Sequence, residues 1–317
     1  MRYIINTVFT FFRLWKAYMR DFVFCLKYSL SIPNYHETDD KRLARIMLLM
    51  HALEKGMSFK ESTRTFGGEK AKALSKRLND YLTTHPINNT CIVALNVLHE
   101  YLTNPNSTQD KAIRTSITLL LDAHKEVVKD GYAGTKNVSE PPTFNKAAIE
   151  TFFSSRSSIR DYSDEPVSDE EIASALHIAS FTPSACNRQT SRVHVYRDKQ
   201  KMKDIINNQL GNQNWCDNAT VLFLITAKES YFGGEYERHQ ALIDGGLYAM
   251  NFVHGLHLNH IASCFKMFVR GVSIERQFRK VTGITADEIP IVLVLAGHYK
   301  PGAVCCPKSV RLKEAIS

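Results

Sequence analysis

The chain has 317 residues, of which 44% are hydrophobic and 23% are charged. This composition is typical of a globular protein of about two domains, and it excludes collagen-like, low-complexity and mainly disordered proteins. The 40 basic and 32 acidic side chains leave a formal charge of +8. Because this excess is not gathered into a basic stripe, we expect an anionic small ligand or a membrane surface as a partner, and no nucleic acid.

Seven cysteines are scattered along the chain without a CxxC pair, so the sequence predicts neither a zinc ribbon nor a thioredoxin-like redox motif. An odd, scattered set is typical of reduced thiols in a cytoplasmic protein. His254, His257 and His260 follow one another at three-residue steps in one predicted helix, without a cysteine or carboxylate partner set. We therefore assign no metal site.

Residues 1–31 combine aromatic and basic side chains. Their longest uncharged run, residues 3–12, is far shorter than a membrane-spanning helix, and no small-residue cleavage pattern follows, so neither a span nor a signal peptide is expected. Two interpretations stay open. The helix lies at a membrane surface, which would place the protein at the inner face of the membrane, or it packs on the rest of the protein with its basic side chains in water. The pattern alone favours the second.

Between residues 39 and 129, apolar residues recur at steps of three and four, which predicts a module of about four helices. Residues 131–146 contain two glycines and two adjacent prolines, and this composition predicts a linker. We therefore divide the chain into a helical module with the basic first helix (1–130), the linker (131–146) and a C-terminal domain (147–317).

The C-terminal domain is predicted to mix helices with short strands. A helix is expected over 147–154, Ser168 and Glu171 form the capping-box pattern of a second helix, and a long helix covers about 238–259. Strands are predicted at 192–196, 220–227, 262–269 and 289–297. The second and fourth strands are continuously apolar, as in central strands covered on both faces. The chain lacks a GxGxxG turn, so a Rossmann domain is not supported.

Arg156 and Arg160 lie four residues apart in a serine-rich stretch, residues 154–160. Two guanidinium groups, serine hydroxyls and backbone N–H groups together suit a dianionic phosphate. The alternative is a solvated polar loop, and the residues by themselves favour that alternative.

A second polar stretch, residues 180–191, follows a predicted helix. Its Asn187 and Gln189 carry amides that donate and accept hydrogen bonds in one plane, which suits the edge of a flat heterocycle such as an isoalloxazine. By itself the stretch is also compatible with an ordinary turn.

Taken in order, the motifs RSSIR (156–160), DEPVSDEEI (164–172) and PSACNRQ (183–189) resemble the nitroreductase family of FMN-dependent oxidoreductases. Residues 243–264 are similar to the central helix and following strand of that family, and residues 291–311 to its last strand and basic tail. The resemblance spans about residues 144–317.

The resemblance implies an α+β fold, with a mainly antiparallel sheet flanked by helices, in an intertwined homodimer that binds FMN at the interface. It implies that NADH or NADPH gives hydride to flavin N5 and that a small organic electron acceptor then takes the electrons. It implies no catalytic acid from the protein.

In this resemblance, residues 156–160 would lie against the phosphate, ribityl chain and pyrimidine side of FMN, and the basic tail would supply further phosphate charge. Residues 183–187 would contact the isoalloxazine, often from the partner subunit, and Gln189 would support their loop. The residues assigned to the cofactor in this way are Arg156, Ser157, Ser158, Arg160, Pro183, Ser184, Ala185, Asn187, Gln189, Lys308 and Arg311.

The chain departs from the family pattern in two places. Thr190 and Ser191 follow Gln189 where many members have Pro-Trp, and the bulky Phe265, Met267 and Phe268 lie in the strand near the expected flavin face. These departures leave FMN binding better supported than any acceptor preference. The alternative function is a catalytically weak flavin-fold adaptor at the membrane surface, in a glycan-assembly complex.

The helical module carries HALEKGMSF (51–59) and RTFGG (64–68). These stretches are similar to the N-terminal extension of a nitroreductase-like subgroup found alongside surface-polysaccharide synthesis. His51, Glu54 and Lys55 lie within one helical turn, which would suit an ionisable cluster over the mouth of the active site. The pattern favours the alternative, an ordinary helix end with Gly56 as its left-handed stop.

Overall fold

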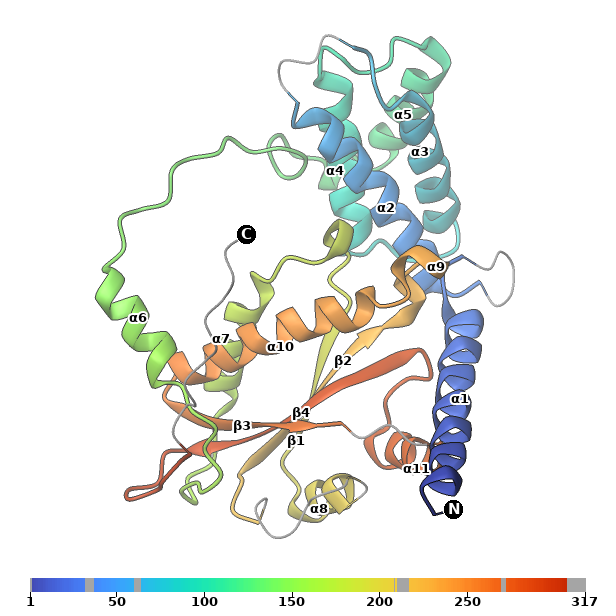
Figure 1. Ribbon diagram of the computed structural model, residues 1–317. Helices are drawn as coiled ribbons and strands as arrows, with labels where there is room; N and C mark the ends of the chain where they lie inside the picture. Colours follow the sequence, from blue (N-terminus) through green and yellow to red (C-terminus); the bar gives the residue numbers. More distant parts are fainter. Residues whose placement is uncertain are drawn as a thin grey trace, which may run out of the picture.

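Figure 1 shows the computed structural model of the chain, which describes residues 2–31, 37–59, 64–207, 209, 217–268 and 272–306. A group of helices stands above a twisted sheet, and the long helix α1 (Arg2–Tyr28) runs down one side of the sheet. On the opposite side, an extended segment leads from the upper helices to α6 (Lys146–Ser155).

The helices of the upper group form where the apolar periodicity predicts them. They are α2 (Asp39–Met57), α3 (Gly68–Leu82), α4 (Asn89–Thr103) and α5 (Lys111–Ala123). The side chains of Thr38, Asn88 and Asp110 cap α2, α4 and α5, each accepting a hydrogen bond from a backbone N–H in the first turn. Such caps satisfy donors that the start of a helix leaves unpaired.

Gly56 differs from its prediction. Helix α2 continues through Gly56 to Met57, and the residue after it, Ser58, is also right-handed, so the interpretation of Gly56 as a left-handed helix stop is wrong. A Cβ atom at Gly56 would overlap the ring of Phe66. The glycine therefore serves a close approach of Phe66 to the helix, which explains its place in the sequence better than a turn does.

Within the described residues, the sheet has four antiparallel strands in the order β1-β2-β4-β3. Their bounds are β1 (Ser191–Tyr196), β2 (Val221–Lys228), β3 (Ile261–Met267) and β4 (Glu288–His298). The two predicted central strands, β2 and β4, do lie in the middle. The expected α+β class, a mainly antiparallel sheet flanked by helices and preceded by a helical region, is confirmed.

Helices cover both faces of the sheet. One face packs on α7 (Asp169–Ser180) and α10 (Gln240–Leu258), and the other on α8 (Lys199–Asn207) and α11 (Val272–Thr282). The predicted capping box at the start of α7 is present, because Ser168 and Glu171 bond each other's backbone. Gly255 of α10 lies so close to Ala175 that a Cβ atom there would meet the backbone of α7.

The helical region and the sheet share one core at the ends of β2 and β4. Tyr231, Phe232 and Ile289 pack with the buried residues of α2–α5. The short helices η3 (Glu229–Tyr231) and α9 (Gly234–Glu237) lie at this junction. The two predicted domains therefore share a core at this junction. Their division at the predicted linker, residues 131–146, stays a prediction.

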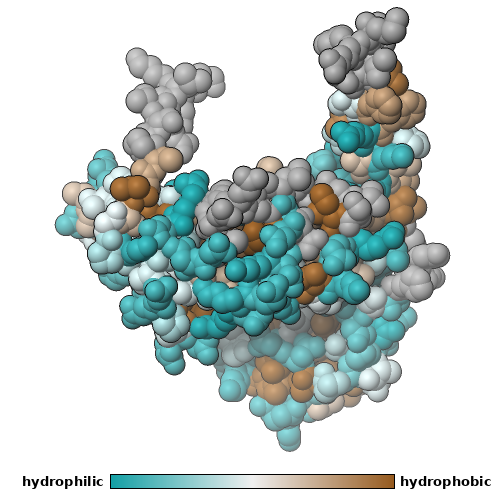
Figure 2. Space-filling view, turned by 90° about the horizontal axis from the view of Figure 1, so that it is seen from below, coloured by the Kyte–Doolittle hydropathy of each residue, from teal (hydrophilic) through white to brown (hydrophobic). Residues whose placement is uncertain are grey.

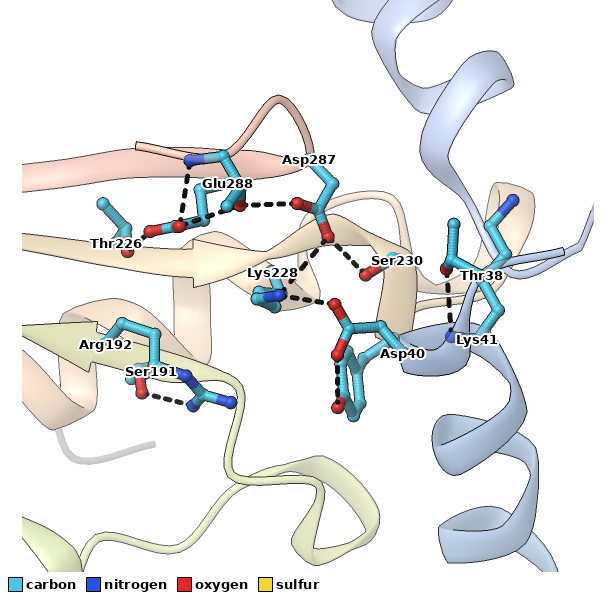
Figure 3. Close-up of polar contacts among 12 residues, drawn as sticks. Thr38, Asp40, Lys41, Ser191, Arg192, Thr226, Lys228, Ser230, Asp287 and Glu288 are labelled. Carbon is cyan, nitrogen blue, oxygen red and sulfur yellow. Dashed lines mark hydrogen bonds and ion pairs between the residues drawn. The ribbon is translucent and has the colours of Figure 1, made fainter. Parts of the chain in front are cut away.

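Polar contacts reinforce the same junction (Figure 3). At the start of α2, Asp40 forms an ion pair with Lys228 at the end of β2 and accepts a hydrogen bond of 3.1 Å from the Tyr231 hydroxyl. Lys228 also lies 4.0 Å from Asp287, which accepts a 2.6 Å bond from Ser230. These contacts fix the start of α2 against the end of β2 and the segment that leads into β4.

Candidate functional site

The serine-rich stretch with the two arginines runs beside the edge strand β3. Ser158 forms a parallel bridge with Ser263, and the N–H of Ile159 donates a 3.0 Å bond to the Ser263 carbonyl. Arg156 begins this stretch at the end of α6. This backbone pairing fixes Ser158 and Ile159 against the sheet, between Arg156 and Arg160. The choice between a phosphate site and a solvated polar loop stays a prediction.

Three cationic side chains lie within electrostatic range of one thiol at this edge. Burial raises the pKa of Cys264, and the charges of Arg160, Lys266 and Arg156, with a hydrogen bond to Ser158, oppose that shift. Lys266 is only 7% exposed. Positive groups and serine hydroxyls that converge in this way form the donor set that a dianionic phosphate requires. We call Arg156, Ser157, Ser158, Arg160 and Lys266 the cation end.

The end of α10 adds two histidines to the same neighbourhood. Burial, followed by the charges of Arg156 and His257, lowers the pKa of His254. The His257 ring lies 2.9 Å from the Ser155 hydroxyl and 3.3 Å from the Tyr299 hydroxyl. Burial and the nearby charge of Arg156 both favour the neutral form of His254, which adds no positive charge to that of the arginines.

The second predicted stretch forms a tight loop between α7 and β1, containing the short helix η2 (Ala185–Asn187). Cys186, Asn187 and Gln189 all have positive φ, at 51°, 51° and 50°. Such left-handed conformations of non-glycine residues cost about 1–3 kcal/mol each and are typical of functional sites. We call Pro183–Gln189 the amide loop.

Hydrogen bonds within the amide loop hold this conformation. The N–H of Gln189 donates 2.9 Å to the Ser184 hydroxyl, and its side-chain amide donates 3.1 Å to the Asn187 side chain. Asn187 and Gln189 are both exposed. Their amides are therefore fixed by each other and presented outward, as an edge-reading role requires.

Arg188, inside the amide loop, anchors it and was not singled out from the sequence. Its guanidinium is fully buried, forms a two-pronged ion pair with Glu237 at 2.5 and 3.0 Å, and donates 2.6 Å to the Tyr231 carbonyl. It also lies 4.6 Å from the centre of the Phe232 ring. Burial alone would raise the pKa of Glu237, but hydrogen bonds from Arg188 and the Gly233 N–H outweigh it and lower that pKa.

Asp244 is the second anchor that the sequence did not reveal. It is 3% exposed on α10, accepts 2.9 Å from the Ala185 N–H and accepts 2.7 Å from the Gln240 side chain. The signal that could have found it is a lone acid in an apolar helix, directly before Gly245 and Gly246. A buried charge in such a position requires partners, and here the partner is the amide loop.

A cavity of about 190 Å³ lies beside the amide loop. Its lining includes Pro183, Ser184, Gln189, Arg192, Asp244 and Tyr248. Figure 3 shows Arg192 beside Ser191 at the start of β1. Because ligand pockets are usually about 300–1,000 Å³, this cavity can hold only part of a molecule as large as FMN.

The cation end and the amide loop lie at opposite ends of α10. Asp244 contacts the loop and His257 lies beside the cation end. The helical rise from one residue to the other is about 20 Å. The same helix exposes Leu242, Ile243 and Leu247, at 39%, 52% and 50%. Among the residues that the structure describes, a single chain therefore does not bring the two predicted groups of cofactor residues into one pocket.

The remaining sequence candidates have varied places. Lys308 and Arg311 lie outside the described residues. Phe268 packs on Phe278 in the core beneath the sheet, Phe265 is partly buried on the other face and Met267 is 76% exposed.

His51 lies 3.2 Å from Glu54, as their spacing on α2 predicts, and Lys55 is exposed. In the described part of the chain, no group of three or more histidine, cysteine or acidic side chains could hold a metal ion. The helices described there include none with the length and apolarity needed to cross a bilayer.

Known proteins resemble parts of this chain. The model of the Nitroreductase family matches residues 153–208. This segment holds every predicted cofactor residue except Lys308 and Arg311.

A curated relative, FMN reductase [NAD(P)H] of Bacillus subtilis (strain 168), is 37% identical over 70 residues. This match covers 22% of the present chain, and the chain spans only 28% of the length of that relative.

Solved structures that are described as nitroreductases are similar to about half of this chain. An FMN-dependent nitroreductase from Clostridium difficile R20291 is 19% identical, with a TM-score of 0.43, and the match covers 49% of this chain and 91% of that one. A nitroreductase family protein from Clostridium novyi NT is 16% identical, with a TM-score of 0.43, over 48% of this chain and 85% of that one.

Proposed function

We propose that the protein is an oxidoreductase of nitroreductase type that uses FMN and NADH or NADPH. The observation that carries the proposal is a pair of complementary receptors beside the two ends of α10: a group of cations and hydroxyls near its C-terminal end, and an outward amide loop near its N-terminal end. The match of residues 153–208 to the Nitroreductase family model supports it, as does the short stretch similar to an FMN reductase.

The donor groups present suit the parts of FMN. Arg156, Arg160 and Lys266 would bind the phosphate, with Ser157 and Ser158 donating further hydrogen bonds. Residues 183–187 and Gln189 would lie against the isoalloxazine edge, and Lys308 and Arg311 would add phosphate charge. When bound, FMN supplies the hydride chemistry, taking hydride from NADH or NADPH and giving two electrons to a small organic acceptor.

We propose a homodimer as the form that completes the site. Two α10 helices packed antiparallel about a twofold axis would bring the cation end of one protomer to the amide loop of the other. The exposed Leu242, Ile243 and Leu247 supply an apolar surface for this contact, and a Cβ atom at Gly246 would meet no atom within 4 Å, which leaves room for a partner side chain.

The test is a visible absorption spectrum of the purified protein, before and after addition of NADPH or NADH. A yellow protein with a flavin spectrum that the nucleotide bleaches supports the proposal. A protein that remains colourless after reconstitution with FMN would contradict it.

The proposal has a narrower form, in which the enzyme serves surface-polysaccharide synthesis. It would then work in the cytoplasm, at the inner face of the membrane. Its support is that the two stretches behind this resemblance form one unit: Phe66 of RTFGG packs against Gly56 of HALEKGMSF, and Tyr101 donates 2.6 Å to the Phe66 carbonyl. Activity towards sugar-linked acceptors, compared with simple nitroaromatics and quinones, tests the role. Equal rates with all of them would remove it.

The second candidate is a catalytically weak flavin-fold adaptor. The exposed face of α1, described below, favours it, because a membrane-bound scaffold needs such a surface. Stopped-flow reduction of the bound flavin separates the two functions: rapid reduction by NADPH and NADH identifies the enzyme, and bound flavin that neither nucleotide reduces identifies the adaptor.

A further inference from the structure

Helix α1 carries an apolar stripe that the fold leaves uncovered. Its members recur at steps of three and four, which places them on one helix face, and each is between 40% and 62% exposed. They are Val8, Phe11, Phe12, Trp15, Met19, Phe22, Val23 and Leu26. Isolated exposed apolar residues are normal in a folded protein, but a continuous stripe of this length marks a contact surface.

The contacts that hold α1 on the protein come from a different side of the helix. The Cys25 thiol donates 3.0 Å to Glu229, Arg20 lies 3.5 Å from Glu275 and the Phe24 ring lies 5.7 Å from the Arg279 guanidinium. These contacts orient α1 by its C-terminal half. Packing on the rest of the protein therefore describes only part of the helix. Most of the stripe faces away from it, and Phe22 and Leu26 at its C-terminal end border a cleft beside α9 and α10.

Basic residues border the stripe. Arg13, Lys16 and Lys27 are exposed on α1, whereas Arg20 is engaged by Asp21 and Glu275. Because an α-helix turns by about 100° per residue, these four basic residues all lie on one flank of the stripe. Seen from below, the arm that carries the N-terminus exposes hydrophobic residues beside hydrophilic ones (Figure 2).

The geometry points to a bilayer with anionic headgroups as the occupant of this surface, with α1 lying flat in the interface. Aromatic and aliphatic side chains would enter the boundary between headgroups and acyl chains, while the arginine and lysines reach the phosphates. An antiparallel second copy of α1 fits less well, because pairing of the two stripes would bring the two basic flanks together. This inference goes beyond the proposed oxidoreductase activity and does not depend on it.

Trp15 gives a direct readout of the contact. The chain has two tryptophans, Trp15 and Trp215, so Trp215→Phe leaves Trp15 as the reporter. With vesicles of phosphatidylcholine and phosphatidylglycerol, we expect a blue shift of its emission and quenching by brominated acyl chains. With phosphatidylcholine alone we expect binding weaker by roughly a hundredfold, from about a fivefold loss for each of the three exposed basic groups.

Matched variants separate the stripe from the rest of the surface. Co-sedimentation with anionic vesicles should weaken at least tenfold for Phe12→Ser combined with Phe22→Ser, and stay unchanged for Tyr236→Ser, which alters a residue 93% exposed on α9. Arg13→Glu with Lys16→Glu should remove the preference for anionic vesicles. Lys72→Glu with Lys76→Glu, the same charge change on the exposed side of α3, should not.

Three outcomes would overturn the inference: an unshifted Trp15 emission with anionic vesicles, equal losses for the stripe and control variants, or a stripe variant that dissociates an oligomer in analytical ultracentrifugation without lipid. The last would assign the stripe to a second copy of the chain. FMN content measured in every variant keeps the result separate from the proposed function, because the altered residues lie outside the cation end and the amide loop.

Discussion

The two ends of α10 are built differently. At the amide loop, the groups that hold the backbone are buried and paired: Arg188 with Glu237, and Asp244 with the Ala185 N–H. At the cation end, the backbone is fixed by pairing with β3, but Arg156, Arg160 and Lys266 have like charges near one another. Its buried partners thus hold the amide loop in shape without a ligand. At the cation end, a bound anion would reduce the repulsion between the like charges.

Because of this difference, substitutions at the two ends should affect two different properties, the free energy of unfolding and the affinity for FMN. Substitutions at the loop anchors should reduce the free energy of unfolding, because they break partnered buried groups. Substitutions at the cation end should leave that free energy nearly unchanged and reduce the affinity for FMN. The expected effects below run from the largest to the smallest.

Arg188→Ala should have the largest effect, a loss of about 3 kcal/mol in the free energy of unfolding. The substitution leaves Glu237 and the Tyr231 carbonyl without their partner, and breaking such a pair typically costs about 3–5 kcal/mol. Urea unfolding followed by circular dichroism measures it, with Arg77→Ala, an exposed arginine of α3, as the control. Equal stability of the two variants would show that the buried ion pair does not anchor the loop.

Arg156→Ala should weaken FMN binding about 10- to 150-fold, since a hydrogen bond to a charged group contributes about 1.5–3 kcal/mol. Fluorescence titration of the apoprotein with FMN gives the dissociation constant. Urea unfolding without FMN should agree with the wild type within about 0.5 kcal/mol. A loss of stability without a loss of FMN affinity would show that Arg156 has a structural role and does not bind the phosphate.

Asp244→Asn should have a moderate effect on the loop. The asparagine oxygen can still accept from the Ala185 N–H, but the bond is no longer charge-assisted, so we expect a loss of about 1 kcal/mol. Because the cavity beside the loop is lined by Asp244, the visible spectrum of bound FMN should also shift. An unchanged spectrum together with unchanged stability would place the flavin away from this loop.

The pH dependence of the loop anchor should be the smallest effect. The pKa of Glu237 is lowered from its ordinary value of 4.5, so its ion pair contributes stability above that value and loses it as the pH falls through the lower folded-state pKa. The difference in unfolding free energy between wild type and Glu237→Gln should therefore shrink below about pH 4.5. A difference that stays constant from neutral pH to pH 3 would contradict the pairing.

Secondary structure was the most predictable level of this protein. The apolar steps of three and four marked α2–α5, and the continuous apolar runs marked β2 and β4, because burial on one or two faces leaves a direct trace in the residue pattern. Gly56 was misread because a glycine in a close helix contact and a glycine at a helix end look alike in sequence. Only the position of Phe66 distinguishes them.

The sequence predicts the two local motifs of the candidate site, but not the residues that other elements bring to it. Motif spacing indicated Arg156, Arg160 and the amide loop, since those residues are adjacent in sequence. Lys266 and Asp244 reach the site through tertiary contacts from β3 and α10, and no local pattern reveals such contacts. The separation of the two ends likewise follows from the length of α10 and not from the motifs.

The most direct test of the account is complementation between two defective chains. Arg156→Ala impairs the cation end, and Ser184→Trp fills the cavity at the amide loop with an indole. If the site forms between protomers, each variant alone should hold little FMN, whereas a mixed dimer, purified through two different tags, should regain one intact site and bind one FMN per dimer. Mixed dimers as empty as the separate variants would contradict the central claim.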